Sequence, residues 1–229
     1  MYEAAVLATV ALLLISAVDY VRRAWIGETN PVPATWVLMM VIMSLSCWMY
    51  WHSPNKTWTG NIAVPTGVLN VVCILTAVII LNVRRGTLKV AFDTVQQWCL
   101  AGGGVIVVFW LITKNTLISY ILVQCIGLIV YVATARRLWY AERVTEPVFF
   151  WACVLSANLC ALYPAWVRDD TFSWIYLART IPTTTGHDFP NRSRATTHGQ
   201  VKESRASPVE QAVPSARLLM GRALVIAVL

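Results

Sequence analysis

The chain has 229 residues, of which 58% are hydrophobic and only 13% are charged, and its mean hydropathy is +0.62. Soluble domains are nearer half apolar and a quarter charged, so this composition excludes an ordinary soluble protein. The net charge of +7 does not indicate a nucleic-acid partner, because most early basic residues stand between long apolar runs, where they set membrane topology.

Six apolar runs have the length of about 20 residues that a membrane-spanning helix requires. In chain order they cover residues 3–21, 33–51, 60–82, 94–113, 116–135 and 147–166. The first run carries its basic flank, Arg22 and Arg23, on its C-terminal side, which is the reverse of a cleaved signal peptide. The sequence therefore predicts an all-α, multi-pass protein of the plasma or inner membrane, with the lipid bilayer as its partner.

Basic residues are distributed unevenly between the loops. With the N-terminus outside, the inner loops hold Arg22, Arg23, Arg84, Arg85, Lys89, Arg136, Arg137 and Arg143, and the outer loops hold Lys56, Lys114 and Arg168. Inner loops of membrane proteins are enriched in Lys and Arg, so this bias predicts an N-terminus outside.

The chain repeats one arrangement of arginine and tryptophan. The first copy is Arg22-Arg23-Ala24-Trp25 with Trp36 and Trp51, and the second is Arg136-Arg137-Leu138-Trp139 with Trp151 and Trp166. The copies lie 114 residues apart in the same orientation, which indicates a duplicated unit of helices. We expect a three-helix bundle over residues 1–86, a linker helix over 87–114 and a second, parallel three-helix bundle over 115–182, a 3+1+3 arrangement.

The last helix of the second bundle is incomplete or atypical in the sequence. The run from Thr171 to Pro182 is too short to cross a bilayer, and Arg179 interrupts it. Residues 183–229 are basic and rich in Ser, Thr, Arg and Pro, which predicts a disordered tail. Two explanations stay open, a marginal seventh span or a reading frame that is shifted near residue 180.

The segment Asp19–Trp36 resembles one in uncharacterised bacterial seven-helix membrane proteins. The matching positions are Gly27-Glu28, Pro31 and Ala34-Thr35-Trp36, and the second half is similar from Arg136 through Glu146 to Trp151 and Asn158. Those proteins in turn resemble the PQ-loop and SWEET superfamily, whose members have two three-helix bundles and a linker helix. Over residues 5–178 the resemblance implies this fold and the transport of a small solute, such as a sugar or an amino acid.

The Pro-Gln pair that names the superfamily is missing from this chain. Asp19 stands in the place of the first proline, and Ala133 or Thr134 stands in the place of the second. Pro65 and Pro164 are the positions that can kink the third and sixth spans instead.

Asn70, Gln124 and Asn158 are amides near the middle of the third, fifth and sixth spans. An amide has donors and an acceptor, so each can bind a solute hydroxyl or amino group. Amides at this depth equally join one helix to another. The resemblance implies a pocket role for Asn70, because SWEET-like proteins line their substrate pocket with an Asn of the third helix.

Two further residues are candidates for a solute site. Trp110 lies deeper in its span than the other tryptophans, which favours stacking on a ligand over a place in the interfacial aromatic belt. Asp19 lies one turn from the inner end of the first span, where a carboxylate is costly, and it is the candidate for proton coupling. An interfacial ion pair with Arg22 or Arg23 is the competing interpretation of Asp19.

No pattern of catalytic or metal-binding residues appears in the sequence. The three histidines have no metal-ligand spacing, the six cysteines form no CxxC pair, and neither HExxH nor GxSxG is present. We expect no enzyme activity, no metal and no other cofactor. The two functions that remain are a small-solute transporter and a membrane scaffold or assembly protein, either of which can form a homo-oligomer.

Overall fold

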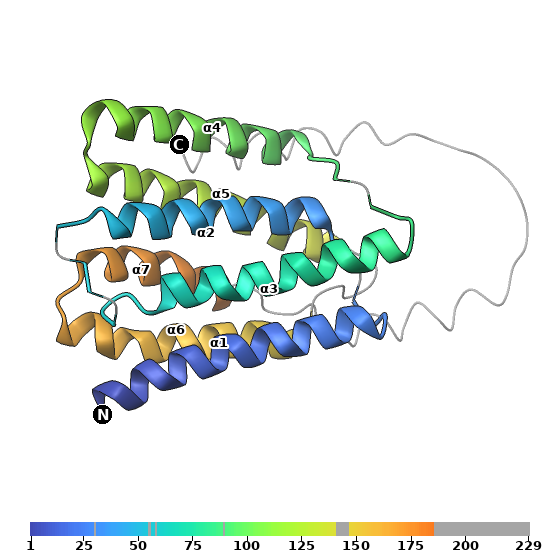
Figure 1. Ribbon diagram of the computed structural model, residues 1–229, viewed down its shortest axis with the longest axis horizontal. Helices are drawn as coiled ribbons and strands as arrows, with labels where there is room; N and C mark the ends of the chain where they lie inside the picture. Colours follow the sequence, from blue (N-terminus) through green and yellow to red (C-terminus); the bar gives the residue numbers. More distant parts are fainter. Residues whose placement is uncertain (30, 55, 58, 89, 141–146, 186–229) are drawn as a thin grey trace, which may run out of the picture. The chain divides into compact units, whose positions relative to one another are not determined.

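Each apolar run of the sequence forms one α-helix, and a seventh helix follows them. The computed structural model describes residues 1–29, 31–54, 56–57, 59–88, 90–140 and 147–185, and Figure 1 shows their path. The helices are α1 (Tyr2–Trp25), α2 (Pro33–Trp51), α3 (Ala63–Arg84), α4 (Thr94–Thr113), α5 (Thr116–Tyr140), α6 (Val148–Val167) and α7 (Thr171–Thr185). The first six begin within three residues of their predicted positions.

Short loops with local stop signals separate the helices. Asp93 caps α4, because its Oδ1 accepts a hydrogen bond from the Gln96 N–H at 2.8 Å while the Asp93 N–H donates to Gln96 Oε1 at 3.1 Å. The helix ends at Lys114, which adopts a left-handed backbone with φ 54°, and α5 begins at Thr116. α4 and α5 therefore form a tight hairpin.

Successive helices run in alternating directions, so their loops gather at two ends of the helix bundle (Figure 1). At one end, Ser173 Oγ donates a hydrogen bond to Gly60 O at 2.9 Å. At the other end, Arg85 Nη2 donates to Ala24 O at 3.2 Å. We refer to them as the Gly60 end and the Ala24 end.

Helix packing follows a regular scheme. α3 packs against both α1 and α2, and α7 packs against both α5 and α6. α1 also packs extensively along α6, and α2 packs along α5. α4 lies against α5 and, over a shorter length, against α2 (Figure 1).

Six of the described helices, α1 to α6, are long and apolar enough to cross a membrane by length and composition. Large apolar side chains are exposed on their outer surfaces, as Ile112 on α4 illustrates with 77% of its surface accessible. Helices that are apolar on every face belong in a large core or in lipid, so the chain has the helices of a multi-pass membrane protein.

α7 is shorter than the other helices, with 15 residues, but it continues through Arg179 and Pro182 to Thr185. Arg179 does not break the helix, because α7 buries this residue against α5 instead of exposing it to lipid. Pro164 lies within α6, whereas Pro65 lies in the first turn of α3, where proline removes no intrahelical hydrogen bond. The tail is predicted from residue 183, but Thr183 to Thr185 still belong to α7, and the predicted tail from residue 186 onward lies outside the described residues.

Candidate functional site

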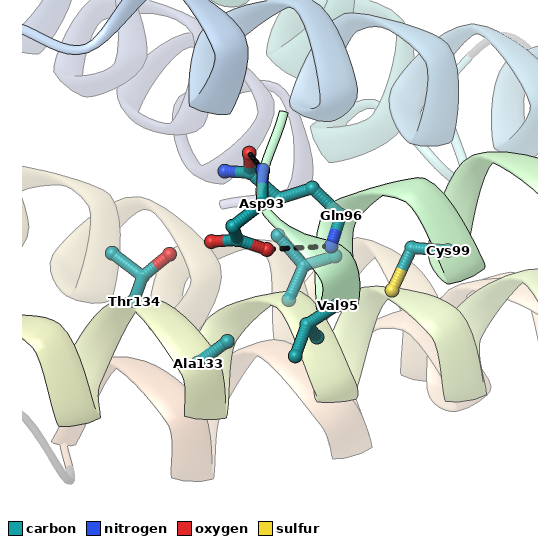
Figure 2. A pocket seen from close by; sticks show the side chains of 7 residues that line it. Asp93, Val95, Gln96, Cys99, Ala133 and Thr134 are labelled. Carbon is teal, nitrogen blue, oxygen red and sulfur yellow. Dashed lines mark hydrogen bonds between the residues drawn. The ribbon is translucent and has the colours of Figure 1, made fainter. Parts of the chain in front are cut away.

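A small pocket opens between the start of α4 and the C-terminal half of α5, at the Ala24 end (Figure 2). Its volume is about 130 Å³, below the range of about 300–1,000 Å³ that is typical of ligand sites. The pocket is lined by Asp93, Val95, Gln96, Cys99, Val130, Ala133 and Thr134.

Two polar residues of this pocket, Asp93 and Gln96, already have partners in the protein. Asp93 and Gln96 form the cap of α4, and Gln96 Nε2 also donates to Thr35 Oγ1 at 3.4 Å. None of the five site residues predicted from the sequence lines the pocket. Its small size and its paired polar groups make it a weak solute site.

Six buried polar residues lie at a similar depth inside the helix bundle. At 1.5 Å per residue, each is about 10–14 Å from the terminus of its helix at the Gly60 end. They come from α1, α3, α5, α6 and α7, and they are Thr9, Asn70, Gln124, Asn158, Arg179 and Thr180. We call this set the polar layer.

Asn70 joins α3 to α1. Its Nδ2 donates one hydrogen bond to Leu13 O at 2.6 Å and another to Ser16 Oγ at 2.8 Å. Both amide protons are therefore used between these two helices. The arrangement gives Asn70 a packing role here, while its predicted contact with a solute stays a prediction.

Gln124 joins α5 to α2 and keeps one polar atom unpaired. Its Nε2 donates to Ser46 Oγ at 2.9 Å, whereas its buried Oε1 has no hydrogen-bond partner in the described part of the chain. A buried amide oxygen without a donor is costly, which makes Gln124 the amide of this set with capacity for a ligand.

Thr9 and Asn158 lie near the contact of α1 with α6. Thr9 Oγ1 lies 2.9 Å from Ala5 O in its own helix and 3.4 Å from Ala157 O in α6. Asn158 Nδ2 donates to Val154 O, one turn earlier in α6, at 2.7 Å.

Trp110 belongs to an aromatic cluster at the Gly60 end. Its ring meets His52 at 5.2 Å and Trp48 at 6.4 Å between centroids, and the Lys114 ammonium lies 4.9 Å from its centroid. Its Nε1 donates to Thr116 Oγ1 at 3.4 Å. The structure thus places Trp110 away from the polar layer.

Asp19 forms an ion pair within α1. Its Oδ2 accepts a hydrogen bond from Arg23 Nε at 2.8 Å, and Arg23 also pairs with Glu28 at 3.1 Å. This is the ion pair that the sequence offers as the alternative to a coupling site, with Arg23 as the partner of Asp19.

Sequence reasoning missed a second group of buried polar residues, which surrounds α7. Two guanidinium nitrogens of Arg179 are buried without a hydrogen-bond partner among the described residues, and Tyr120 Oη and both amide atoms of Asn61 are buried as well. Arg179 is the residue through which the sequence could have indicated this group, because a charged residue within a membrane helix indicates a functional position by default.

The buried Asp170 connects the start of α7 to its neighbours at the Gly60 end. Its Oδ1 accepts a hydrogen bond from the Ser173 N–H at 3.1 Å, which caps the helix, and its Oδ2 lies 2.7 Å from Tyr50 Oη. Tyr50 Oη also lies 2.6 Å from Thr57 O. These contacts tie α7 to α2 and to the loop before α3.

Within the described part of the chain, no group of three or more His, Cys, Asp or Glu residues is placed to hold a metal ion. Comparison of the chain with protein-family models, with curated proteins and with solved structures found no match.

Proposed function

We propose that α1–α3 and α5–α7 are two parallel three-helix bundles linked by α4, the 3+1+3 arrangement of the PQ-loop and SWEET superfamily. The helix contacts support this proposal. If α1, α2 and α3 are exchanged with α5, α6 and α7, the contacts α1·α3, α2·α3 and α1·α6 become α5·α7, α6·α7 and α2·α5, and all six occur. A duplicated architecture accounts for this correspondence.

On this architecture the chain acts as a transporter of a small solute, with the solute bound between the two bundles at the depth of the polar layer. The observation that carries the proposal is the unpaired Gln124 Oε1, because Gln124 hydrogen-bonds with Ser46 across the boundary between the bundles. Asn70 and Asn158 remain candidate solute contacts and Asp19 a candidate coupling residue, whereas Trp110 lies away from this depth.

Uptake into proteoliposomes tests this function. The purified full chain is reconstituted and assayed with radiolabelled sugars, amino acids and organic acids, alongside the variants Gln124→Leu and Asn70→Ala. We expect uptake of one solute class by the wild type and at least a tenfold lower rate for Gln124→Leu. The matched control is Cys125→Ala, because Cys125 is the next residue of α5 and its side chain faces outward.

A membrane scaffold or assembly protein is the second candidate function. The interhelical hydrogen bonds of Asn70 and Gln124 favour it, because they use the polar layer to hold helices together. No uptake of any tested solute, with correct reconstitution confirmed, would favour this function over transport. We propose for either function a plasma or inner membrane, an N-terminus outside and no enzyme activity.

A further inference from the structure

Arg179 is a guanidinium in the interior of the helix bundle. Only 7% of its surface is accessible, and it lies eight residues into α7, about 12 Å from the helix start. A charged group at this depth is costly unless it is paired. The Arg179 guanidinium therefore requires a partner of opposite charge.

The described residues supply no charged partner for Arg179. Both ion pairs in the described part of the chain belong to Arg23. Asp170, which caps the start of α7, is nine residues away, about 13.5 Å along the axis, and is engaged by Ser173 and Tyr50.

Most of the hydrogen-bonding capacity of Arg179 is unused. Its Nη2 lies 3.4 Å from Thr180 Oγ1, a long contact, whereas Nε and Nη1 are buried without an acceptor among the residues that the structure describes. A guanidinium has five N–H donors in one plane, and this geometry matches the two oxygens of a carboxylate. The unpaired N–H donors are therefore suited to bind a planar oxyanion.

Neighbouring residues hold the guanidinium in place without neutralising it. The rings of Tyr176 and Tyr131 lie 5.2 and 5.5 Å from the guanidinium carbon, which is the range of a cation–π contact. A Cβ atom at Gly127 would overlap Nη1, so the glycine makes room for the guanidinium against α5. The contacts with both rings leave the N–H donors of the guanidinium available to an acceptor.

Gln124 supplies a second polar group to this site. It lies on the same face of α5 as Gly127, three residues earlier, and its Oε1 lacks a donor. A ligand with a carboxylate and a hydroxyl or amino group would satisfy both Arg179 and Gln124.

We propose that Arg179 binds the carboxylate of a small organic anion, with Gln124 accepting a hydrogen bond from the hydroxyl or amino group of the same molecule. The proposal names the solute class of the transporter proposed above and rests on that function only for its physiological role. Binding itself can be measured without transport.

Thermal unfolding of the purified full chain, at constant ionic strength, tests the proposal with four probes. Lactate carries the carboxylate and the hydroxyl, propionate lacks the hydroxyl, lactamide lacks the charge, and chloride is an inorganic anion. We expect lactate to raise the Tm by about 2 °C or more, propionate to raise it less, and lactamide and chloride to leave it unchanged.

Variants assign the binding to Arg179. Arg179→Gln should abolish the lactate shift and should not lower the Tm without ligand, because it removes an unpaired buried charge. Arg179→Lys should give a reduced shift, because an ammonium lacks the planar fork. The exposed-arginine control, Arg22→Gln, should keep the full shift.

Several results would overturn the proposal. The proposal is overturned if neither carboxylate shifts the Tm, if chloride or lactamide gives an equal shift, or if the lactate shift survives in Arg179→Gln. A lower ligand-free Tm for Arg179→Gln also overturns it, because that result would indicate a partner within the protein. If Arg179→Gln does not fold, an undiminished shift in Arg179→Lys also overturns it. Lactate binding without uptake would reject the transport function alone, and uptake of a neutral solute that is unaffected by Arg179→Gln would reject this inference alone.

Discussion

Individual polar side chains in the helix bundle differ in where they find their partners. The hydroxyls of Ser46 and Thr180 donate to carbonyls four residues earlier in their own helices, so they are satisfied before any tertiary contact forms. Asn70 depends instead on α1, which accepts both of its donated hydrogen bonds. Such an amide adds stability only when two helices are correctly placed.

Replacing Asn70 by alanine should therefore weaken the contact between α3 and α1. We expect Asn70→Ala to lower the free energy of unfolding by about 1 kcal/mol, because interhelical hydrogen bonds in membranes contribute amounts of this order. Unfolding by SDS titration measures the change. Asn82→Ala is the matched control, since Asn82 Nδ2 donates to Val78 O within α3, and an equal loss there would contradict the explanation.

The sequence predicts that Asn70 and Gln124 are buried amides, but it does not predict their partners. The acceptors Leu13 O, Ser16 Oγ and Ser46 Oγ become neighbours only through the rotation of each helix against the next. Hydropathy treats Arg179 as an interruption of the span, because it assumes that a charged side chain in a span contacts lipid. Packing against α5 decides its surroundings, and no local pattern encodes that packing.

Helix positions, in contrast, follow from the sequence. The predicted bounds of α2 and α4 agree with the structure at both ends, because prolines, caps and uncharged runs define them locally. The ends of α1 and α5 lie four and five residues beyond their predicted ends, and the end of α7 lies three residues beyond. The threonines at the end of α7 donate hydrogen bonds to carbonyls one turn earlier, such as Thr184 Oγ1 to Thr180 O at 2.8 Å, and the helix continues through them.

The glycine run of α4 allows a prediction about helix packing. A Cβ at Gly103 would lie 3.7 Å from Leu45 Cδ1 in α2, whereas a Cβ at Gly104 would have no neighbour within 4 Å. Gly103→Leu should lower the free energy of unfolding by about 1–3 kcal/mol through overpacking, and Gly104→Leu should leave it nearly unchanged. SDS titration of both variants measures this difference, and equal effects would show that α4 packs otherwise.

For the molecule as a whole, the alternation of helix directions fixes which loops share a side of the membrane, whatever the orientation. Lys56 and Lys114 belong to loops at the Gly60 end, and Arg85 belongs to the Ala24 end. The basic bias of the loops predicts one orientation, with the Ala24 end inside.

Cysteine labelling in intact cells tests this orientation. A membrane-impermeant maleimide should label Lys56→Cys and Lys114→Cys in intact cells, but Arg85→Cys only after permeabilisation. Labelling is compared with that of the unmodified chain, whose six cysteines supply the background. The reverse pattern would place the N-terminus inside.

The packing of α1 against α6 also bears on how the protein is made. Thr9 and Ala157, which meet in this contact, are 148 residues apart, so at about 5–20 residues per second a ribosome needs roughly 7–30 s to supply the partner of α1. Thr9 and Ser16 both donate to carbonyls of α1 itself, so these two hydroxyls have acceptors throughout the interval in which α6 is still being made.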